Sequence, residues 1–128
     1  MRIVFYGQPA TKKNSMRLLR GKGGRIFPAP SKQYKDYERS CLRQLLPKHV
    51  TKVSNPVNVC CVYYMPTKRR VDLVNLLEAS MDILVKGGVL ADDNARIVAG
   101  HDGSKVMYDK EHPRVEIEIE PIVQEVNT

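Results

Sequence analysis

Five carboxylates gather between residues 69 and 94, in the segment RRVDLVNLLEASMDILVKGGVLADDN. They are Asp72, Glu78, Asp82, Asp92 and Asp93. Carboxylate oxygens are ligands that Mg²⁺ prefers, and substrate phosphates commonly complete its coordination. One or two such ions can activate water and stabilise the leaving oxygen when a phosphodiester is cleaved. The segment therefore indicates metal-dependent phosphodiester chemistry, and the alternative is a capped helix with ordinary surface acids.

A strongly basic stretch precedes this acidic segment in the chain. Residues 1–50 hold twelve Lys and Arg against two acids, whereas residues 51–128 hold nine against twelve. The cations crowd together among glycines: Lys12, Lys13, Arg17, Arg20, Lys22 and Arg25. Such a run is typical of a solvated loop or of an arm that binds a polyanion. Together with the acidic segment, it favours a nucleic-acid-binding arm near a metal site.

Helical spacing of apolar residues predicts the elements that would position these side chains. One helix is expected from 32 to about 46, with Ser31 as its N-cap and a proline at its end. A second is expected from Asp72, as its N-cap, to about Lys86, and Gly87–Gly88 should end it. The last two acids of the segment then lie in the loop that follows this helix.

Alternating and β-branched patterns predict a sheet beside these helices. Strands are expected at 2–7, 57–65 and 114–120, with shorter ones near 25–27, 95–100 and 104–108. The near-continuous apolar run at 57–65 is typical of a central strand. The strand at 114–120 should bury Val115, Ile117 and Ile119 and leave its glutamates in solvent. Because helices and strands mix without a regular repeat, we predict an α+β fold with a mixed sheet of about four to five strands and two main helices.

The organisation of the chain is expected to be simple. Residues 1–128 should form a single domain, with a basic flexible loop at about 10–25 and a loose tail after 121. The sequence shows neither an apolar run of membrane-spanning length nor a secretory signal at its start. The three cysteines, Cys41, Cys60 and Cys61, lack metal-site spacing and suggest reduced thiols. We therefore expect a cytoplasmic protein without a membrane partner.

Three segments carry a more specific pattern. They are GQPATKKNS at 7–15, DLVNLLEASMDIL at 72–84 after a basic run, and GVLADDNARIV at 88–98. Together they resemble the RusA family of Holliday-junction resolvases, which are small dimeric endonucleases. The resemblance covers roughly residues 2–120. It implies a RusA-like fold, Mg²⁺ as the cofactor with Mn²⁺ able to substitute, and branched DNA as the partner.

The resemblance and the charge pattern together suggest a role for each position. The catalytic residues would be Asp72, Glu78 and Asp93. The metal ligands would be these three together with Asp92. Asn75 and Asp82 would orient the metal ligands without binding the metal themselves. Phosphates would be held, without any reading of base sequence, by Lys12, Lys13, Arg17, Arg69 and Arg70.

Two positions depart from the family pattern. Val74 stands where the family has its second catalytic aspartate, and Glu78 stands where it has a lysine. Positions 74 and 78 lie one helical turn apart on one face, and helical side chains lean toward the N-terminus. We therefore expect the Glu78 carboxylate to take the place vacated at Val74, and the alternative is a purely structural glutamate. The missing cation would come from Lys68, Arg70, Lys86 or a partner subunit.

These features predict a Mg²⁺-dependent, structure-selective DNA endonuclease that resolves four-way junctions and other branched DNA. A homodimer suits paired phosphodiester cleavage, because a two-fold pair presents equivalent sites to equivalent strands. Two other interpretations stay open. One is an inactive protein that binds branched or single-stranded DNA, and the other is an interaction protein whose acidic loop is only surface. The expected location is the cytoplasm of a bacterium or of a phage-infected host cell.

Overall fold

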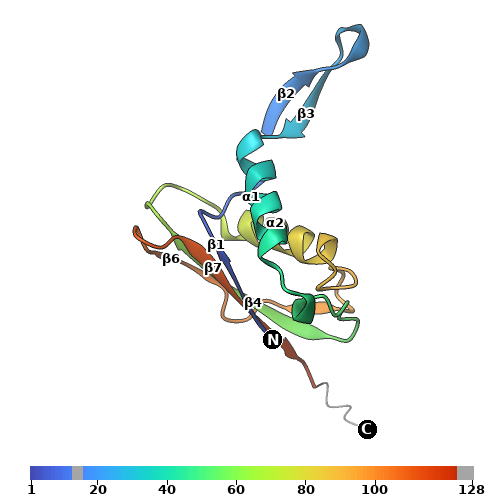
Figure 1. Ribbon diagram of the computed structural model, residues 1–128, viewed down its shortest axis with the longest axis vertical. Coiled ribbons are helices and arrows are strands. Elements are labelled where there is room, and N and C mark those ends of the chain that lie inside the picture. Colours follow the sequence, from blue (N-terminus) through green and yellow to red (C-terminus); the bar gives the residue numbers. More distant parts are fainter. Residues whose placement is uncertain (13–15, 124–128) are drawn as a thin grey trace.

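The computed structural model describes residues 1–12 and 16–123 of the chain. They form a mixed sheet of five strands, two α-helices and a separate two-stranded hairpin. In Figure 1 the helices lie on one side of the sheet, and the hairpin projects away from the rest of the molecule. The predicted α+β class, with a mixed sheet of about four to five strands and two main helices, is confirmed.

The five strands of the sheet come from both ends and the middle of the chain. They are β1 (Arg2–Tyr6), β4 (Val57–Met65), β5 (Val98–Gly100), β6 (Lys105–Tyr108) and β7 (Arg114–Pro121). Their order is β1-β7-β4-β5, and β6 pairs with a later part of β4. β7 is antiparallel to β1 and β4, whereas β5 and β6 run parallel to β4. β4 is therefore the central strand, as its apolar run predicted.

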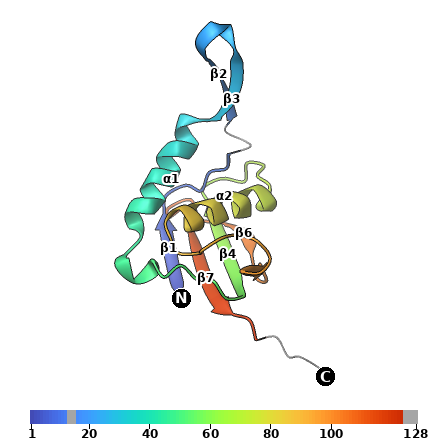
Figure 2. The ribbon, with the colours of Figure 1, turned by 90° about the vertical axis from the view of Figure 1, so that its right-hand side faces the viewer.

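One face of this sheet packs under α1 (Lys32–Gln44) and α2 (Leu73–Lys86). Figure 2 shows both helices in front of β1, β7 and β4. The three residues predicted to point inward from β7, Val115, Ile117 and Ile119, are exposed by 3% or less. Apolar side chains of both helices join them in one core cluster. The core thus fixes the position of α2, which carries much of the candidate site.

Both helices begin where their capping residues predicted. The Ser31 hydroxyl accepts a hydrogen bond from the backbone N–H of Tyr34 at 3.2 Å, which caps α1. Asp72 occupies the N-cap position of α2 with extended backbone angles, although its carboxylate caps no N–H group. At the other end of α2, Gly88 has φ of 77°, a conformation that favours glycine and ends the helix. α1 ends at Gln44, two residues before the expected end.

The segment that the sequence assigned to a flexible basic loop contains a strand. β2 (Met16–Arg20) pairs antiparallel with β3 (Ile26–Pro30), and a short 3₁₀ turn, η2 (Lys22–Gly24), lies between them. Gly23 and Gly24 both have positive φ, so glycine suits this turn. The loop prediction is wrong over 16–20 because cross-strand pairing outweighs a local composition of cations and glycines. The prolines of β3 do not prevent pairing, since both strands of a two-stranded ribbon are edges.

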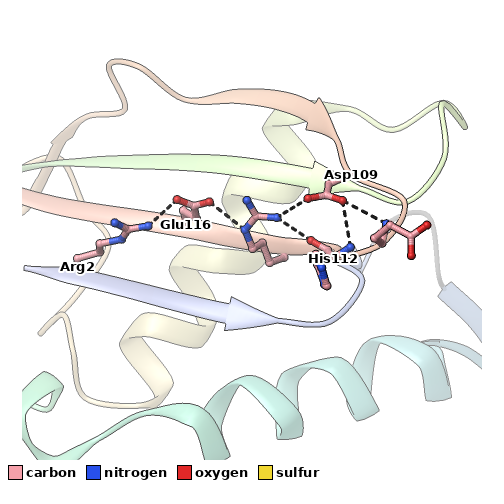
Figure 3. Close-up of polar contacts among 6 residues, drawn as sticks. Arg2, Asp109, His112 and Glu116 are labelled. Carbon is pink, nitrogen blue, oxygen red and sulfur yellow. Dashed lines mark hydrogen bonds and ion pairs between the residues drawn. The ribbon is translucent and has the colours of Figure 1, made fainter.

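The open face of the sheet carries an ion-pair network, which Figure 3 shows in close-up. The Arg114 guanidinium contacts Asp109 and Glu116, each at 2.9 Å, and Arg2 contacts the second oxygen of Glu116 at 2.6 Å. The guanidinium carbon of Arg114 also lies 3.9 Å from the centroid of the Tyr64 ring. Glu116, expected in solvent, is therefore half-buried and paired. Arg114 also holds the pKa of Asp109 below its usual value.

Other expectations concern the cysteines, the membrane and the tail. The three cysteines form no disulfide, and Cys41 and Cys61 are buried whereas Cys60 is half-buried. In the ranges 1–12 and 16–123, no helix is both long and apolar enough to cross a membrane. β7 extends to Pro121, and most of the tail expected to be loose lies outside the described residues.

Candidate active site

The first part of the site is the exposed face of α2. Val74 is 71% exposed, and Glu78 is also exposed one turn further along the same helix. Residues four apart in a helix are neighbours on its surface, and each leans toward the helix N-terminus. The structure therefore supplies the helical frame on which the relocation of a carboxylate from 74 to 78 depends. It also shows that Val74 covers no core.

The second part is a cavity of about 570 Å³ at the start of α2. The cavity is lined by the segment 8–11, Gln33, Met65, Thr67 and the segment 69–72. The cavity is therefore bordered by Arg69, Arg70 and Asp72, which come from one irregular stretch of chain just before α2. The Asp72 carboxylate accepts a long hydrogen bond of 3.4 Å from the Asn75 amide. Residues from the segment GQPATKKNS (7–15) and the first residue of the segment DLVNLLEASMDIL (72–84) therefore line the same cavity.

The third part is the loop that holds Asp92 and Asp93. One oxygen of Asp92 accepts a hydrogen bond from the backbone N–H of Asp93 at 2.7 Å, and the other accepts from the Asn94 amide at 3.3 Å. The Asn94 oxygen in turn accepts from the backbone N–H of Arg96 at 2.9 Å. These hydrogen bonds hold the loop in a tight turn. Asn94 takes part in them as donor and acceptor, a role that the sequence did not indicate.

The electrostatics of this loop connect it to α2. Partial desolvation raises the pKa of Asp93, and the hydrogen bond to Asp92 together with the charges of Asp92 and Asp82 raises it further. Asp82 lies on α2, one turn after Glu78. Carboxylates that raise the pKa of a neighbour also attract a cation to the same place, because both effects come from the same negative potential.

An unexpected ion pair joins Asp82 to the start of the hairpin. The Lys12 ammonium lies 2.8 Å from the Asp82 carboxylate and 5.6 Å from the centroid of the Tyr34 ring. Tyr34 is 1% exposed, and its hydroxyl has no hydrogen-bond partner within the part of the chain that the structure describes. Burial first, and then the charges of Glu38 and Asp82, raise the pKa of that hydroxyl. Lys12 therefore contacts both α2 and α1, and its predicted binding of phosphate stays a prediction.

The structure says less about the other residues that were predicted to bind phosphate or to replace the family lysine. Lys13 lies outside the described residues, and of Arg17 only the backbone in β2 is described. Two of the suggested substitutes for the missing lysine have other contacts: Lys86 pairs with Glu38 at 2.7 Å, and Lys68 lies over the ring of Tyr108. Lys12 is a further cation beside the acids, and no signal in the sequence could have paired it with a residue 70 positions away.

The carboxylates of the candidate site have the chemistry that a hard cation requires, but not the arrangement of a ready metal site. Among residues 1–12 and 16–123, no three His, Cys, Asp or Glu side chains stand together as a ready metal site. Mg²⁺, however, is often bound by one or two carboxylates and completes its shell with water and substrate phosphate. Asp92 and Asp93 offer two neighbouring carboxylates, the number that this smaller requirement needs. The complete set of four carboxylate ligands stays a prediction.

Comparison with known proteins gives an independent result. Residues 7–120 match the model of the family described as Endodeoxyribonuclease RusA. A curated protein of Aquifex aeolicus (strain VF5), named Crossover junction endodeoxyribonuclease RusA, is 29% identical over 104 residues. That alignment covers 80% of this chain and 79% of the relative. The family match includes the cavity-lining segments, the exposed face of α2 and the Asp92–Asp93 loop, and on this basis the chain belongs to the RusA family of endodeoxyribonucleases.

Proposed function

We propose that this endonuclease cleaves branched DNA, with the four-way junction as its leading substrate, in a reaction that requires Mg²⁺. The family match supports endonuclease activity, and the name of the Aquifex relative supports junction DNA as the substrate. Nucleases of this kind generally use a divalent metal. The observation that carries the proposal is the cavity, because Arg69, Arg70 and Asp72 all line it. Cations suited to a phosphate there adjoin a carboxylate suited to a metal.

In the proposed site, Asp72, Glu78, Asp92 and Asp93 hold the metal. When bound, Mg²⁺ supplies an activated water and charge stabilisation for phosphodiester cleavage. Arg69 and Arg70 hold the phosphate backbone at the cavity, a contact that sets position but not sequence preference. Asn75 orients the Asp72 carboxylate by hydrogen bonding, and Asp82 adds negative potential at Asp93.

Glu78 departs from the family pattern, so its role is proposed on helix geometry. A carboxylate carried by the longer Glu side chain at 78 can extend toward the preceding turn, where Val74 offers none. The Lys12 ammonium, held at Asp82, then serves as the cation of the site in place of the family lysine. Paired cleavage is proposed to use a homodimer, since a four-way junction offers two equivalent strands.

A direct test is incision of a synthetic four-way junction by the wild-type chain. Mg²⁺ should support paired nicks at symmetric positions in opposing strands, and EDTA should abolish them. A duplex of the same length should be left uncut. Incision that survives EDTA would refute the metal requirement. Junction binding without incision in Mg²⁺ or Mn²⁺ would show a DNA-binding protein without nuclease activity.

A further inference from the structure

The β2–β3 hairpin stands apart from the rest of the molecule as a two-stranded ribbon (Figures 1 and 2). The sequence from 12 to 35 contains no acidic residue. Three cations of the ribbon are exposed at its far end: Arg20, Lys22 and Arg25. A projecting element with charge of one sign is suited to a polyanion, because each cation that neutralises a phosphate releases counterions.

This ribbon also exposes large apolar side chains. Leu18 is 73% exposed and Ile26 is 61% exposed. Leu18 and Arg20 lie two residues apart on β2, so they share a face, and Arg20 pairs directly with Ile26 of β3. One face of the ribbon therefore combines two aliphatic side chains with a cation. Cations alone would be sufficient for phosphate binding, so the aliphatic pair requires its own explanation.

DNA offers a partner for both features at once. A two-stranded ribbon has the width of the major groove, and proteins that unstack DNA insert Leu or Ile between base steps. A branch point is the place in a junction where the stacking of bases is interrupted, so apolar faces of bases are accessible there. A second copy of the hairpin is a poorer partner, because cations would face cations.

We propose that the β2–β3 hairpin is a branch-point wedge, in which Leu18 and Ile26 pack against bases at the junction centre. Arg20, Lys22 and Arg25 hold the phosphates on either side. This inference rests on the proposed junction function and adds the element that distinguishes a branch from a duplex. It also assigns the recognition of branched structure to the hairpin, away from the carboxylates of the candidate site.

The test uses the double variant Leu18→Ser with Ile26→Ser, which removes no charge. Both side chains are exposed, so the melting temperature should hardly change. Val123→Ser is the control, since it removes an aliphatic side chain that is 86% exposed elsewhere on the molecule. Dissociation constants are measured for a four-way junction and for a duplex. A 2-aminopurine base at the branch point reports unstacking by its fluorescence.

The double variant should lose roughly tenfold to a hundredfold of the preference for junction over duplex, because two apolar side chains no longer leave water. The rise in 2-aminopurine fluorescence seen with wild type should disappear, while duplex affinity stays the same. Unchanged preference and fluorescence in the double variant would overturn the wedge alone. A wild-type protein that binds junction and duplex equally would overturn the wedge as well, whereas failure of the wild type to incise the junction in Mg²⁺ would overturn the proposed function. A dimer that becomes a monomer on substitution, seen by light scattering, would show that the hairpin binds a second copy instead.

Discussion

The projecting hairpin and the α2 helix are opposite in charge and also in construction. α2 buries one face, with Leu76, Ile83 and Leu84 each exposed by 1% or less, and presents acids on the other. Among the described residues, β2 and β3 of the hairpin pair only with each other, and Leu18 and Ile26 are left in solvent. A reaction centre needs side chains held to a fraction of an ångström, which a packed helix provides. A binding arm that must follow an irregular substrate gains from standing clear of the core.

The largest expected effect is the loss of a carboxylate from the α2 region. Asp72→Asn or Asp93→Asn should lower junction cleavage by roughly a hundredfold or more, because a metal supplies several kcal/mol of transition-state stabilisation. Asn is as good an N-cap as Asp, so α2 should keep its start in the first variant. Junction affinity should persist or increase, since a negative charge beside phosphate is removed. Asp102→Asn, at an exposed turn, is the matched control. Full cleavage by both variants would remove them from the site.

The role of Glu78 can be separated from simple decay of the site. Glu78→Gln keeps the shape of the side chain but removes the charge, so Mg²⁺ affinity and cleavage should fall together, by roughly tenfold or more. Val74→Asp with Glu78→Lys rebuilds the family pattern and should recover activity that Glu78→Lys alone lacks. Because Val74 is 71% exposed, the added aspartate should not lower stability appreciably. A fully active Glu78→Gln would support the structural interpretation of this glutamate.

The hairpin side of the comparison is tested through salt dependence. Changing Arg20, Lys22 and Arg25 to Gln should reduce the slope of log K against log salt by roughly 2 to 3, one for each lost phosphate contact. Cleavage of bound junction should change much less, because these cations lie outside the α2 region. The control removes three exposed cations from elsewhere: Lys48, Lys105 and Lys110. Equal slopes in the two triple variants would mean that the hairpin contributes only general positive charge.

Lys12 links the two regions, and its substitution has the smallest expected effect on stability and on DNA affinity, although cleavage should fall because its ammonium is the proposed cation of the site. Lys12→Met removes the ion pair with Asp82, which is partly exposed, so the free energy of unfolding should fall by about 0.5 kcal/mol. Lys32→Met removes a more exposed pair with Asp36 and should cost less, which denaturant titration can measure. If Lys12 contacts α2 and not phosphate, the slope of log K against log salt for DNA binding should not change in the Lys12→Met variant. A slope reduced by roughly 1 would return Lys12 to the phosphate-binding group.

Local signals in the sequence were enough to predict most of the fold. Asp72 and the Gly87–Gly88 pair bounded α2 correctly, and strict alternation identified the buried side of β7. These predictions succeeded because capping and amphipathic burial act over a few residues. The strand at 16–20 was missed because its stability depends on pairing with β3, and a cation-rich composition resembles coil.

The candidate site was predictable as a set of residues but not as a set of contacts. The acidic segment and the basic run before α2 were visible in the sequence. The pairing of Lys12 with Asp82 was not, because it joins residues 70 positions apart and depends on how α2 packs. The Arg2–Glu116–Arg114 network likewise follows from the β1–β7 register, which no local pattern specifies.

The central claim is that carboxylates of α2 and of the following loop hold one metal site. The most direct measurement is anomalous diffraction from crystals of the wild-type chain soaked in Mn²⁺, which shows metal and ligands without reference to activity. We expect a peak within coordination distance of Asp72 and Asp93, with the Glu78 carboxylate turned toward it. A peak held by Asp72 and Asp93 with Glu78 pointing away would contradict the relocated carboxylate. No peak near any of these three residues, at saturating Mn²⁺, would contradict the metal site itself.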